Sequence, residues 1–237
     1  MTPPIVECRD VHKTYRQGAL EVQALAGLDL AVEKGEFTVV CGPSGSGKTT
    51  ALNLIGALDR PTSGRVVVDG RDLGTMSRRA LSLLRRDRIG FVFQAYNLIP
   101  VLTAFENAEM VLALKGGPAE ARHQKVMALL AEVGLEGMEH RRPHELSGGQ
   151  QQRVAIVRAI ASDPAVVLAD EPTANVDSAT ADHLLDIMAH LNEKHGATFI
   201  FSTHDPRVME RARRVVRLVD GRVERDDVRA PATGGSP

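Results

Sequence analysis

The sequence of 237 residues contains only two cysteines, Cys8 and Cys41, which is too few for a disulfide framework. Isolated cysteines are typical of a reducing compartment, and we expect each to be a small buried residue. No uninterrupted apolar run approaches the roughly 20 residues that cross a bilayer, so we predict no transmembrane helix. The first nine residues also lack a continuous apolar segment, and we expect no secretory signal.

The sequence also lacks an excess of charge of either sign, because 29 Lys and Arg residues face 30 Asp and Glu residues. The net charge of -1 gives the chain no global attraction to nucleic acid or to anionic lipid. Hydrophobic residues make up 43% of the sequence, which suits a globular protein with a sizeable buried core. We therefore expect partners to be recognised by local sites.

Short apolar runs alternate with helical patterns along most of the chain. The runs that we interpret as strands are residues 39–41, 65–68, 89–93, 166–169, 198–202 and 215–219. Residues 49–58 are predicted to form a helix that carries Leu52, Ile55 and Leu58 on one face. This alternation predicts an α/β fold with a mainly parallel central sheet.

The middle of the chain differs, because helical patterns follow one another from about residue 103 to 161 with no convincing strand between them. Thr103 and Glu106 fit a capping box that begins one of these helices, and Pro118 lies at the start of the next. We interpret this stretch as a helical subdomain inserted into the α/β core.

A glycine-rich segment lies between the predicted strand that ends at Cys41 and the helix that follows, the context of a phosphate-binding loop. Its glycines allow successive backbone N–H groups to surround phosphate oxygens, and the helix N-terminus favours the anion. Lys48 is expected to reach the β and γ phosphates, and the hydroxyl of Thr49 to bind Mg²⁺. The candidate nucleotide-binding residues here are Gly42, Pro43, Ser44, Gly45, Ser46, Gly47, Lys48, Thr49 and Thr50.

Two adjacent carboxylates, Asp170 and Glu171, follow the apolar strand predicted over residues 166–169. Neighbouring side chains on an extended chain point to different sides, so the two carboxylates are able to take different roles. We expect Asp170 to hold the Mg²⁺ shell and Glu171 to orient or deprotonate the attacking water. Together with the loop, they indicate a P-loop NTPase but leave kinases, GTPases, helicases and motors open.

A third motif, Leu146 followed by Ser147, Gly148, Gly149 and Gln150, opens a predicted helix and resembles the signature sequence of the ABC ATPase family. A serine hydroxyl and glycine N–H groups at a helix N-terminus form a second anion site. The chain nevertheless has one phosphate loop. In the ABC family the signature of one protomer contacts the γ-phosphate bound to the other. The resemblance therefore implies a head-to-tail homodimer that shares two ATP molecules.

Further positions match the family pattern in the expected order. Tyr15 resembles the aromatic residue that stacks on adenine, and Gln94 the glutamine that joins the Mg²⁺ and water shell. His204 resembles the histidine that contacts the γ-phosphate, and Asp177 the aspartate that crosses the dimer interface. Val176 departs from the pattern, because Leu is commoner there. The resemblance implies that Glu171, His204, Gln94 and Lys48 are catalytic and that Thr49, Gln94 and Asp170 bind the metal.

The resemblance covers about residues 5–224 and implies a P-loop NTPase (RecA-like) core with an N-terminal antiparallel β part and the inserted α-helical subdomain. We expect one ABC ATPase domain over residues 1–225, in which the core spans about 1–94 and 164–225 and the helical subdomain about 95–163. Residues 226–237 mix proline, glycine and charge without periodicity, and we predict a flexible tail there.

Residues 93–100 and the segment after them resemble the branch of the family that contains lipoprotein-release, macrolide-export and cell-division ATPases. This resemblance implies ATP and Mg²⁺ as cofactors and integral membrane permease subunits with large extracytoplasmic domains as partners. It places the chain on the cytoplasmic face of the inner membrane, held there through the permease. Export, lipoprotein release or mechanotransmission would then be driven by ATP hydrolysis.

Two other functions remain open from the sequence. A regulatory ABC ATPase would control an envelope or cell-division process by the same cycle without moving cargo. A soluble ABC ATPase acting on nucleic acid or ribosomes is disfavoured, since no sustained heptads separate Lys48 from Leu146 and the chain has one cassette. We expect no nucleic-acid partner. An arginine cluster before Gln94 is interpreted as a solvated helix face, with permease docking as the alternative: Arg78, Arg79, Arg85, Arg86 and Arg88.

Overall fold

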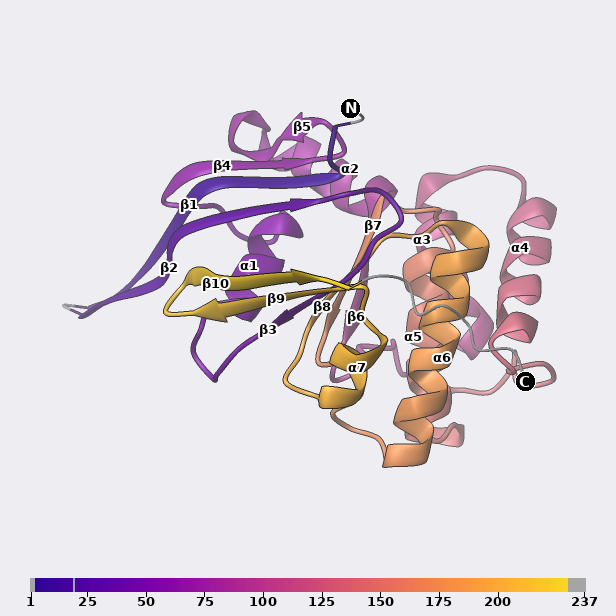
Figure 1. The fold of residues 1–237 in the computed structure, drawn as a ribbon. Coiled ribbons are helices and arrows are strands. Elements are labelled where there is room, and N and C mark those ends of the chain that lie inside the picture. The colour runs from indigo at the N-terminus through magenta and orange to yellow at the C-terminus, as the bar shows by residue number, and fades with distance from the viewer. Residues whose placement is uncertain (1–2, 19, 230–237) are drawn as a thin grey trace.

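The computed structural model describes residues 3–18 and 20–229, which form two sheets with helices packed between and beside them (Figure 1). The first sheet is antiparallel and has the strand order β2-β1-β4-β5. Its strands are β1 (Val6–Gln17), β2 (Leu20–Val32), β4 (Ser63–Val68) and β5 (Arg71–Asp72). Buried and exposed residues alternate over the second half of β2, as expected for a sheet that packs one face on the core. This sheet is the expected N-terminal antiparallel part.

The second sheet has the order β10-β9-β3-β8-β7-β6, and its neighbouring strands are parallel except for the antiparallel pair of β9 and β10. All residues of β3 and β8 are buried, because a parallel sheet is covered on both faces. The strands are β3 (Phe37–Cys41), β6 (Ile89–Phe93), β7 (Val166–Asp170), β8 (Phe199–Ser202), β9 (Arg214–Val219) and β10 (Arg222–Val228). The predicted α/β fold with a mainly parallel sheet is confirmed.

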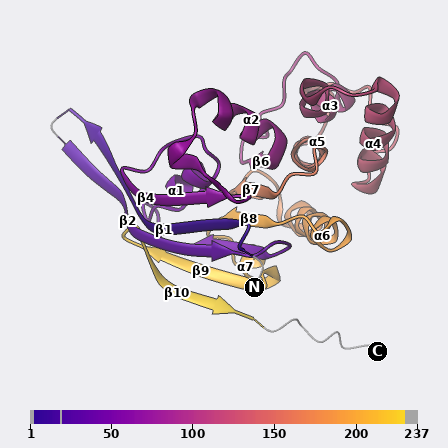
Figure 2. The same cartoon turned by 90° about the horizontal axis from the view of Figure 1, so that it is seen from above.

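The helices divide into those that cover the parallel sheet and a group at one side of it. Figure 2 shows α3, α4 and α5 on the side of the molecule away from the β1–β2 hairpin. The helices are α1 (Lys48–Ile55), α2 (Arg78–Arg88), α3 (Ala104–Lys115), α4 (Ala119–Glu132), α5 (Gly148–Ile160), α6 (Ser178–His195) and α7 (Pro206–Arg211), with short 3-10 turns at Leu73–Thr75 and Pro143–Glu145.

The inserted helical stretch forms as the sequence predicts. Thr103 Oγ1 accepts a hydrogen bond from the Glu106 backbone N–H, and Glu106 Oε2 accepts one from the Thr103 N–H, so the capping box that begins α3 is confirmed. Pro118 is the N-cap of α4. Since α3, α4 and α5 follow one another without an intervening strand, the helical insertion is confirmed, whereas its exact boundaries at residues 95–163 stay a prediction.

The core has two parts, one on each face of the parallel sheet, and β8 contributes to both. Phe199 and Phe201 pack with the helices α5 and α6, whereas Ile200 packs on the side of α1 and the antiparallel sheet. Successive strand residues point to opposite faces, so one apolar run supplies both layers. Cys8 and Cys41 are buried as expected, and burial raises the pKa of the Cys8 thiol to about 12.

Two predicted boundaries are wrong. The helix expected to reach residue 58 ends at Ile55, because Gly56 caps it and Ala57 adopts a left-handed φ of 54°. Leu58 is 50% exposed and does not belong to the buried face. Residues 226–228, expected to belong to a tail, lie instead in β10, which runs to Val228. Residues 230–237 of that predicted tail lie outside the described residues.

Candidate active site

The glycine-rich loop follows β3 and is shaped by contacts that exclude side chains. Gly42 has a φ of 147°, and a Cβ there would lie 2.1 Å from the Leu218 carbonyl oxygen. Gly47 has a φ of 99°, and a Cβ there would lie 2.5 Å from the Ala24 carbonyl oxygen. These conformations and contacts leave no room for a side chain at Gly42 or Gly47. The chain therefore forms a tight loop whose backbone faces the space at the start of α1.

Lys48 begins α1 and reaches back over this loop. Its Nζ donates hydrogen bonds to the carbonyl oxygens of Gly42 at 2.8 Å and Pro43 at 2.9 Å. The ammonium is thereby held at the mouth of the loop, where an anion would meet it together with the helix N-terminus. Ser46 differs from its neighbours, because the residue is 2% exposed and its Oγ has no hydrogen-bond partner among the described residues.

A cavity of about 780 Å³ opens above the loop. Strand β2 forms one wall, and the carboxyl ends of the parallel strands form another. Parallel strands bring their carboxyl ends to the same edge of a sheet, so residues distant in sequence meet here. The lining residues include Tyr15, Val22, Gln23, Ala24, Gly42, Pro43, Ser44, Gly45, Gly47, Lys48, Thr49, Thr50, Gln94, Glu171 and His204.

Glu171 follows β7 and is fixed by two neighbours from the end of β8. Its Oε1 lies 2.7 Å from His204 Nδ1, and its Oε2 accepts a hydrogen bond from Thr203 Oγ1 at 2.8 Å. Glu171 has a φ of 46°, a left-handed conformation that is costly for a residue with a Cβ. The carboxylate is therefore held in one orientation at the cavity wall, as a group that positions water requires.

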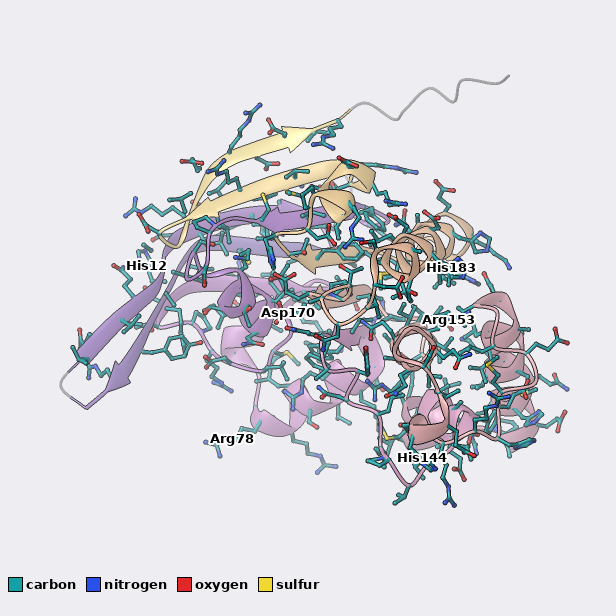
Figure 3. The ribbon with its side chains drawn as sticks, turned by 90° about the horizontal axis from the view of Figure 1, so that it is seen from below. His12, Arg78, His144, Arg153, Asp170 and His183 are labelled. Carbon is teal, nitrogen blue, oxygen red and sulfur yellow. The ribbon has the colours of Figure 1, made fainter. Side chains whose placement is uncertain are left out.

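Asp170 is the last residue of β7 and lies beside the start of α1. Thr49 Oγ1 donates a hydrogen bond to Asp170 Oδ1 at 3.3 Å. Figure 3 shows Asp170 near the centre of the molecule, whereas Arg78 and His144 lie at its periphery. Burial raises the pKa of the Asp170 carboxyl, so a cation beside it would stabilise the ionised form.

Tyr15 lines the cavity and is 38% exposed. Its hydroxyl donates to Asp59 Oδ2 at 2.9 Å, and Lys13 Nζ lies 4.7 Å from the ring centroid. Burial and the hydrogen bond to Asp59 raise the pKa of the Tyr15 hydroxyl. The polar end of the side chain is thus anchored while the ring stays available to a planar group.

The signature residues are not part of this cavity. Ser147 is the exposed N-cap of α5: its Oγ accepts from the Gln150 N–H at 3.3 Å, and Gln150 Oε1 accepts from the Ser147 N–H at 2.9 Å. Gly148 and Gly149 form the first turn of α5, and neither lines the cavity. Asp177 caps α6 through a bond from the Thr180 N–H and also lies outside the cavity.

Two residues of the site were missed by the sequence analysis. Thr203 lies beside His204 and holds Glu171, a role that an extra hydroxyl next to the histidine could have indicated. Asn175 bonds Gln94 from a loop 81 residues away, and the sequence contains no local signal for this contact. The arginine cluster is also mixed: Arg78 and Arg79 are exposed, but Arg85 is half-buried and donates to the Ala57 carbonyl oxygen.

The strand β3, a glycine-rich loop that precedes a lysine-led helix, and the adjacent carboxylates at the end of β7 in the same sheet together define an ATP-binding site of the P-loop class. The family model described as ABC transporter matches residues 25–174. The chain therefore belongs to the ABC transporter family and is an ATPase of this family.

Individual relatives agree with this assignment. A lipoprotein-releasing system ATP-binding protein LolD of Anaeromyxobacter dehalogenans is 49% identical over 94% of each chain. A macrolide export ATP-binding/permease protein MacB of Hyphomonas neptunium is 45% identical over 95% of this chain, which spans 35% of that relative. The solved structure of a dimeric post-hydrolysis state of the ATP-binding cassette MJ0796, bound to ADP and Pi, has a TM-score of 0.87 and 43% identity, and the match covers 95% of this chain and 99% of that one.

Proposed function

We propose that this chain is the ATP-hydrolysing subunit of a membrane transporter and works as a head-to-tail homodimer with two composite sites. One observation carries the proposal. The cavity contains the phosphate loop, Gln94, Glu171 and His204, while Ser147 stands exposed at the N-terminus of another helix, outside the cavity. A second copy that brings its Ser147 and glycine N–H groups to this cavity would complete the enclosure of the triphosphate. MJ0796, which is similar over nearly its whole length, forms a dimer.

Within each site, the chain's own residues have distinct roles. Lys48 neutralises the β and γ phosphates, and the ring of Tyr15 stacks on the base. Glu171 accepts the proton of the attacking water, and His204 and Thr203 hold its carboxylate in the orientation for this role. His204 also donates to the γ-phosphate. The water is thus held in line with the phosphate and deprotonated at one carboxylate oxygen, which is the positioning that phosphoryl transfer requires.

The residues present fit a Mg²⁺ ion shared with the phosphates. Thr49 and Asp170 offer a hydroxyl and a half-buried carboxylate in contact with each other, and Gln94 adds an amide oxygen. The described residues contain no group of three or more His, Cys, Asp or Glu side chains that would hold a metal by themselves. Mg²⁺ is bound in such sites by one or two carboxylates together with waters and phosphates, so this small oxygen set is appropriate. The ion would neutralise charge on the phosphates.

The relatives support the proposal of a membrane partner. Since LolD and MacB proteins are similar over the whole of this domain, we propose permease subunits with large extracytoplasmic domains and a role in export, lipoprotein release or mechanotransmission. No helix in the described part of the chain is long and apolar enough to span a membrane. The permease would hold the chain at the cytoplasmic face of the inner membrane, and closure of the ATPase dimer would move it.

A groove of about 320 Å³ beside α2 is the proposed contact with that permease. Its lining is mainly apolar and includes the half-buried Arg85 and Arg86 together with Asn97, Arg158 and Ser162. Replacing both arginines with Glu should abolish co-purification with the permease and leave the ATPase rate of the isolated chain within twofold. Arg78 and Arg79, which are exposed, provide the matched control, and their reversal should leave co-purification intact. If the variant with both Arg85 and Arg86 replaced still co-purifies with the permease, the proposed docking role of these two residues is wrong.

The homodimer is tested by the dependence of ATP turnover on protein concentration. The rate per protomer should rise with concentration and reach a plateau once the dimer is saturated, because one copy lacks half of the site. A Ser147→Ala variant should show a lower plateau. A constant rate per protomer from the lowest concentration, indifferent to Ser147→Ala, would contradict the composite site.

A further inference from the structure

Gln94 and Asn175 form a two-way contact at the edge of the ATP cavity. Gln94 is the first residue after β6, and Asn175 lies in the loop that follows β7. Asn175 Nδ2 donates to the Gln94 carbonyl oxygen at 3.0 Å, and Gln94 Nε2 donates to Asn175 Oδ1 at 3.2 Å. One amide side chain therefore binds both the backbone and the side chain of the same residue.

The chemistry of this contact fixes the direction of both amides. A backbone carbonyl oxygen only accepts, so Asn175 must turn its nitrogen toward the Gln94 backbone and its oxygen toward the Gln94 side chain. Gln94 must then offer its own amide nitrogen to Asn175. The amide oxygen of Gln94 is the end left for the nucleotide, and oxygen is the atom that a hard divalent cation binds.

We propose that Asn175 is a positioning residue, which determines that Gln94 presents its amide oxygen rather than its nitrogen to the metal-bound nucleotide. This inference rests on the proposed role of Gln94 in the metal shell. It gives the loop before Asp177, which contains Asn175, a function inside its own protomer. Asn175 acts through Gln94, and the structure shows Asn175 outside the group of cavity-lining residues.

Asn175 is itself held in place by the turn that follows Gln94. Tyr96 Oη donates to the Asn175 carbonyl oxygen at 3.1 Å. Tyr96 and Asn97 have left-handed φ values of 57° and 51°, and the buried Arg158 of α5 donates to the carbonyl oxygens of both, at 2.8 Å and 2.5 Å. Because a buried cation stabilises this costly turn, the Gln94–Asn175 contact belongs to a fixed arrangement that is tied to the signature helix.

The test separates metal binding from ATP binding in the Glu171→Gln background, in which turnover is suppressed. The affinity for ATP is measured by titration calorimetry, once with Mg²⁺ and once with EDTA. The ratio of the affinity in Mg²⁺ to the affinity in EDTA is then compared between variants. Asn175→Ala should reduce this ratio about three- to tenfold, since two hydrogen bonds that orient Gln94 are lost, and leave the affinity in EDTA unchanged. Gln94→Ala should reduce the ratio at least as much.

Double variants show whether Asn175 acts through Gln94. Adding Asn175→Ala to Gln94→Ala should cause no further change. Adding Asn175→Ala to Gln94→Glu should also cost nothing, because both terminal atoms of the new side chain are oxygens and no choice remains to be made. A merely structural role would lower the ratio equally in every background. Asn192→Ala is the matched control, since its buried amide donates to the Gly35 and Ala197 carbonyl oxygens, and it should lower stability without changing the ratio.

The outcomes distinguish this inference from the function on which it rests. A ratio that falls in Gln94→Ala but not in Asn175→Ala would overturn the positioning role alone. The same conclusion would follow if the effects of Asn175→Ala and Gln94→Ala were additive in the double variant. An unchanged ratio in Gln94→Ala would overturn the proposed metal role of Gln94 and the inference with it.

Discussion

Glu171→Gln is the substitution for which the structure makes the sharpest prediction. The new side chain has the same shape but cannot accept a proton. Its oxygen is able to accept from His204, and its nitrogen is able to donate to Thr203 Oγ1, because a hydroxyl also accepts. Both contacts that hold the side chain are therefore kept, and the free energy of unfolding should change by less than about 1 kcal/mol.

Turnover should respond very differently. Removing a positioned general base costs about 100- to 10,000-fold in rate, so kcat should fall by that factor while ATP binding persists. Phosphate release gives kcat, calorimetry gives the ATP affinity, and urea unfolding gives stability. Gel filtration of the variant with ATP should show a trapped dimer, because hydrolysis no longer reopens it.

The control for this experiment is Thr203→Val, which keeps the Glu171 carboxylate and removes one hydrogen bond to it. Its kcat should fall about tenfold at most, since Glu171 keeps its contact with His204. Full activity in Glu171→Gln, or loss of ATP binding in step with turnover, would refute the assignment of Glu171 as the base.

Two further predictions concern stability and binding. Gly47→Ala should lower the free energy of unfolding by about 2 kcal/mol and abolish ATP binding. The reason is that φ at this position is 99° and the new Cβ would lie 2.5 Å from the Ala24 carbonyl oxygen. A normal free energy of unfolding in urea would contradict this prediction. Burial alone would raise the pKa of Glu132, but hydrogen bonds led by that from Lys194 hold it below its usual value. The stability that Glu132 contributes is thus present above the unfolded pKa of about 4.5 and lost as pH falls through the folded value. Glu132→Gln should therefore cost about 1 kcal/mol at pH 7 and progressively less as the pH is lowered below 4.5. The exposed control Glu136→Gln should show no such cost.

The parts of the site that the sequence predicted are those encoded in contiguous residues. The phosphate loop is a local strand-loop-helix unit, and its glycines are needed where Gly42 and Gly47 meet the backbone of other strands. The carboxylates at the end of β7 were predicted because an apolar run, residues 166–169, directly precedes Asp170. The local pattern was sufficient in these cases because the geometry follows from a few consecutive residues.

Contacts between distant segments could not be predicted in the same way. Thr203 contacts Glu171 because β7 and β8 are neighbours in the sheet. The sequences of these two strands do not determine that they are neighbours. Asn175 bonds Gln94 for the same reason, since the loops after β6 and β7 lie side by side. The sequence therefore predicted the candidate reacting groups but not Thr203 and Asn175, which form hydrogen bonds with Glu171 and Gln94.

The two wrong boundaries have physical causes as well. The apolar spacing of the first helix continues to Leu58, but Gly56 and the left-handed Ala57 end the helix earlier. The end of β10 is almost entirely polar, so it has no apolar alternation to reveal it. Its pairing with β9 is supported instead by the bidentate ion pair of Arg214 and Asp226, at 2.8 and 2.7 Å.

Activity recovered by mixing two inactive variants tests the composite site most directly. Lys48→Ala destroys the phosphate loop and leaves the signature intact, and Ser147→Arg does the reverse. In an equal mixture, the heterodimer pairs the intact loop of one chain with the intact signature of the other. Each variant alone should be inactive, and the mixture should regain about a quarter of the normal rate, since half of the dimers contain one complete site of two. A mixture as inactive as its components would contradict a triphosphate site shared between two copies of this chain.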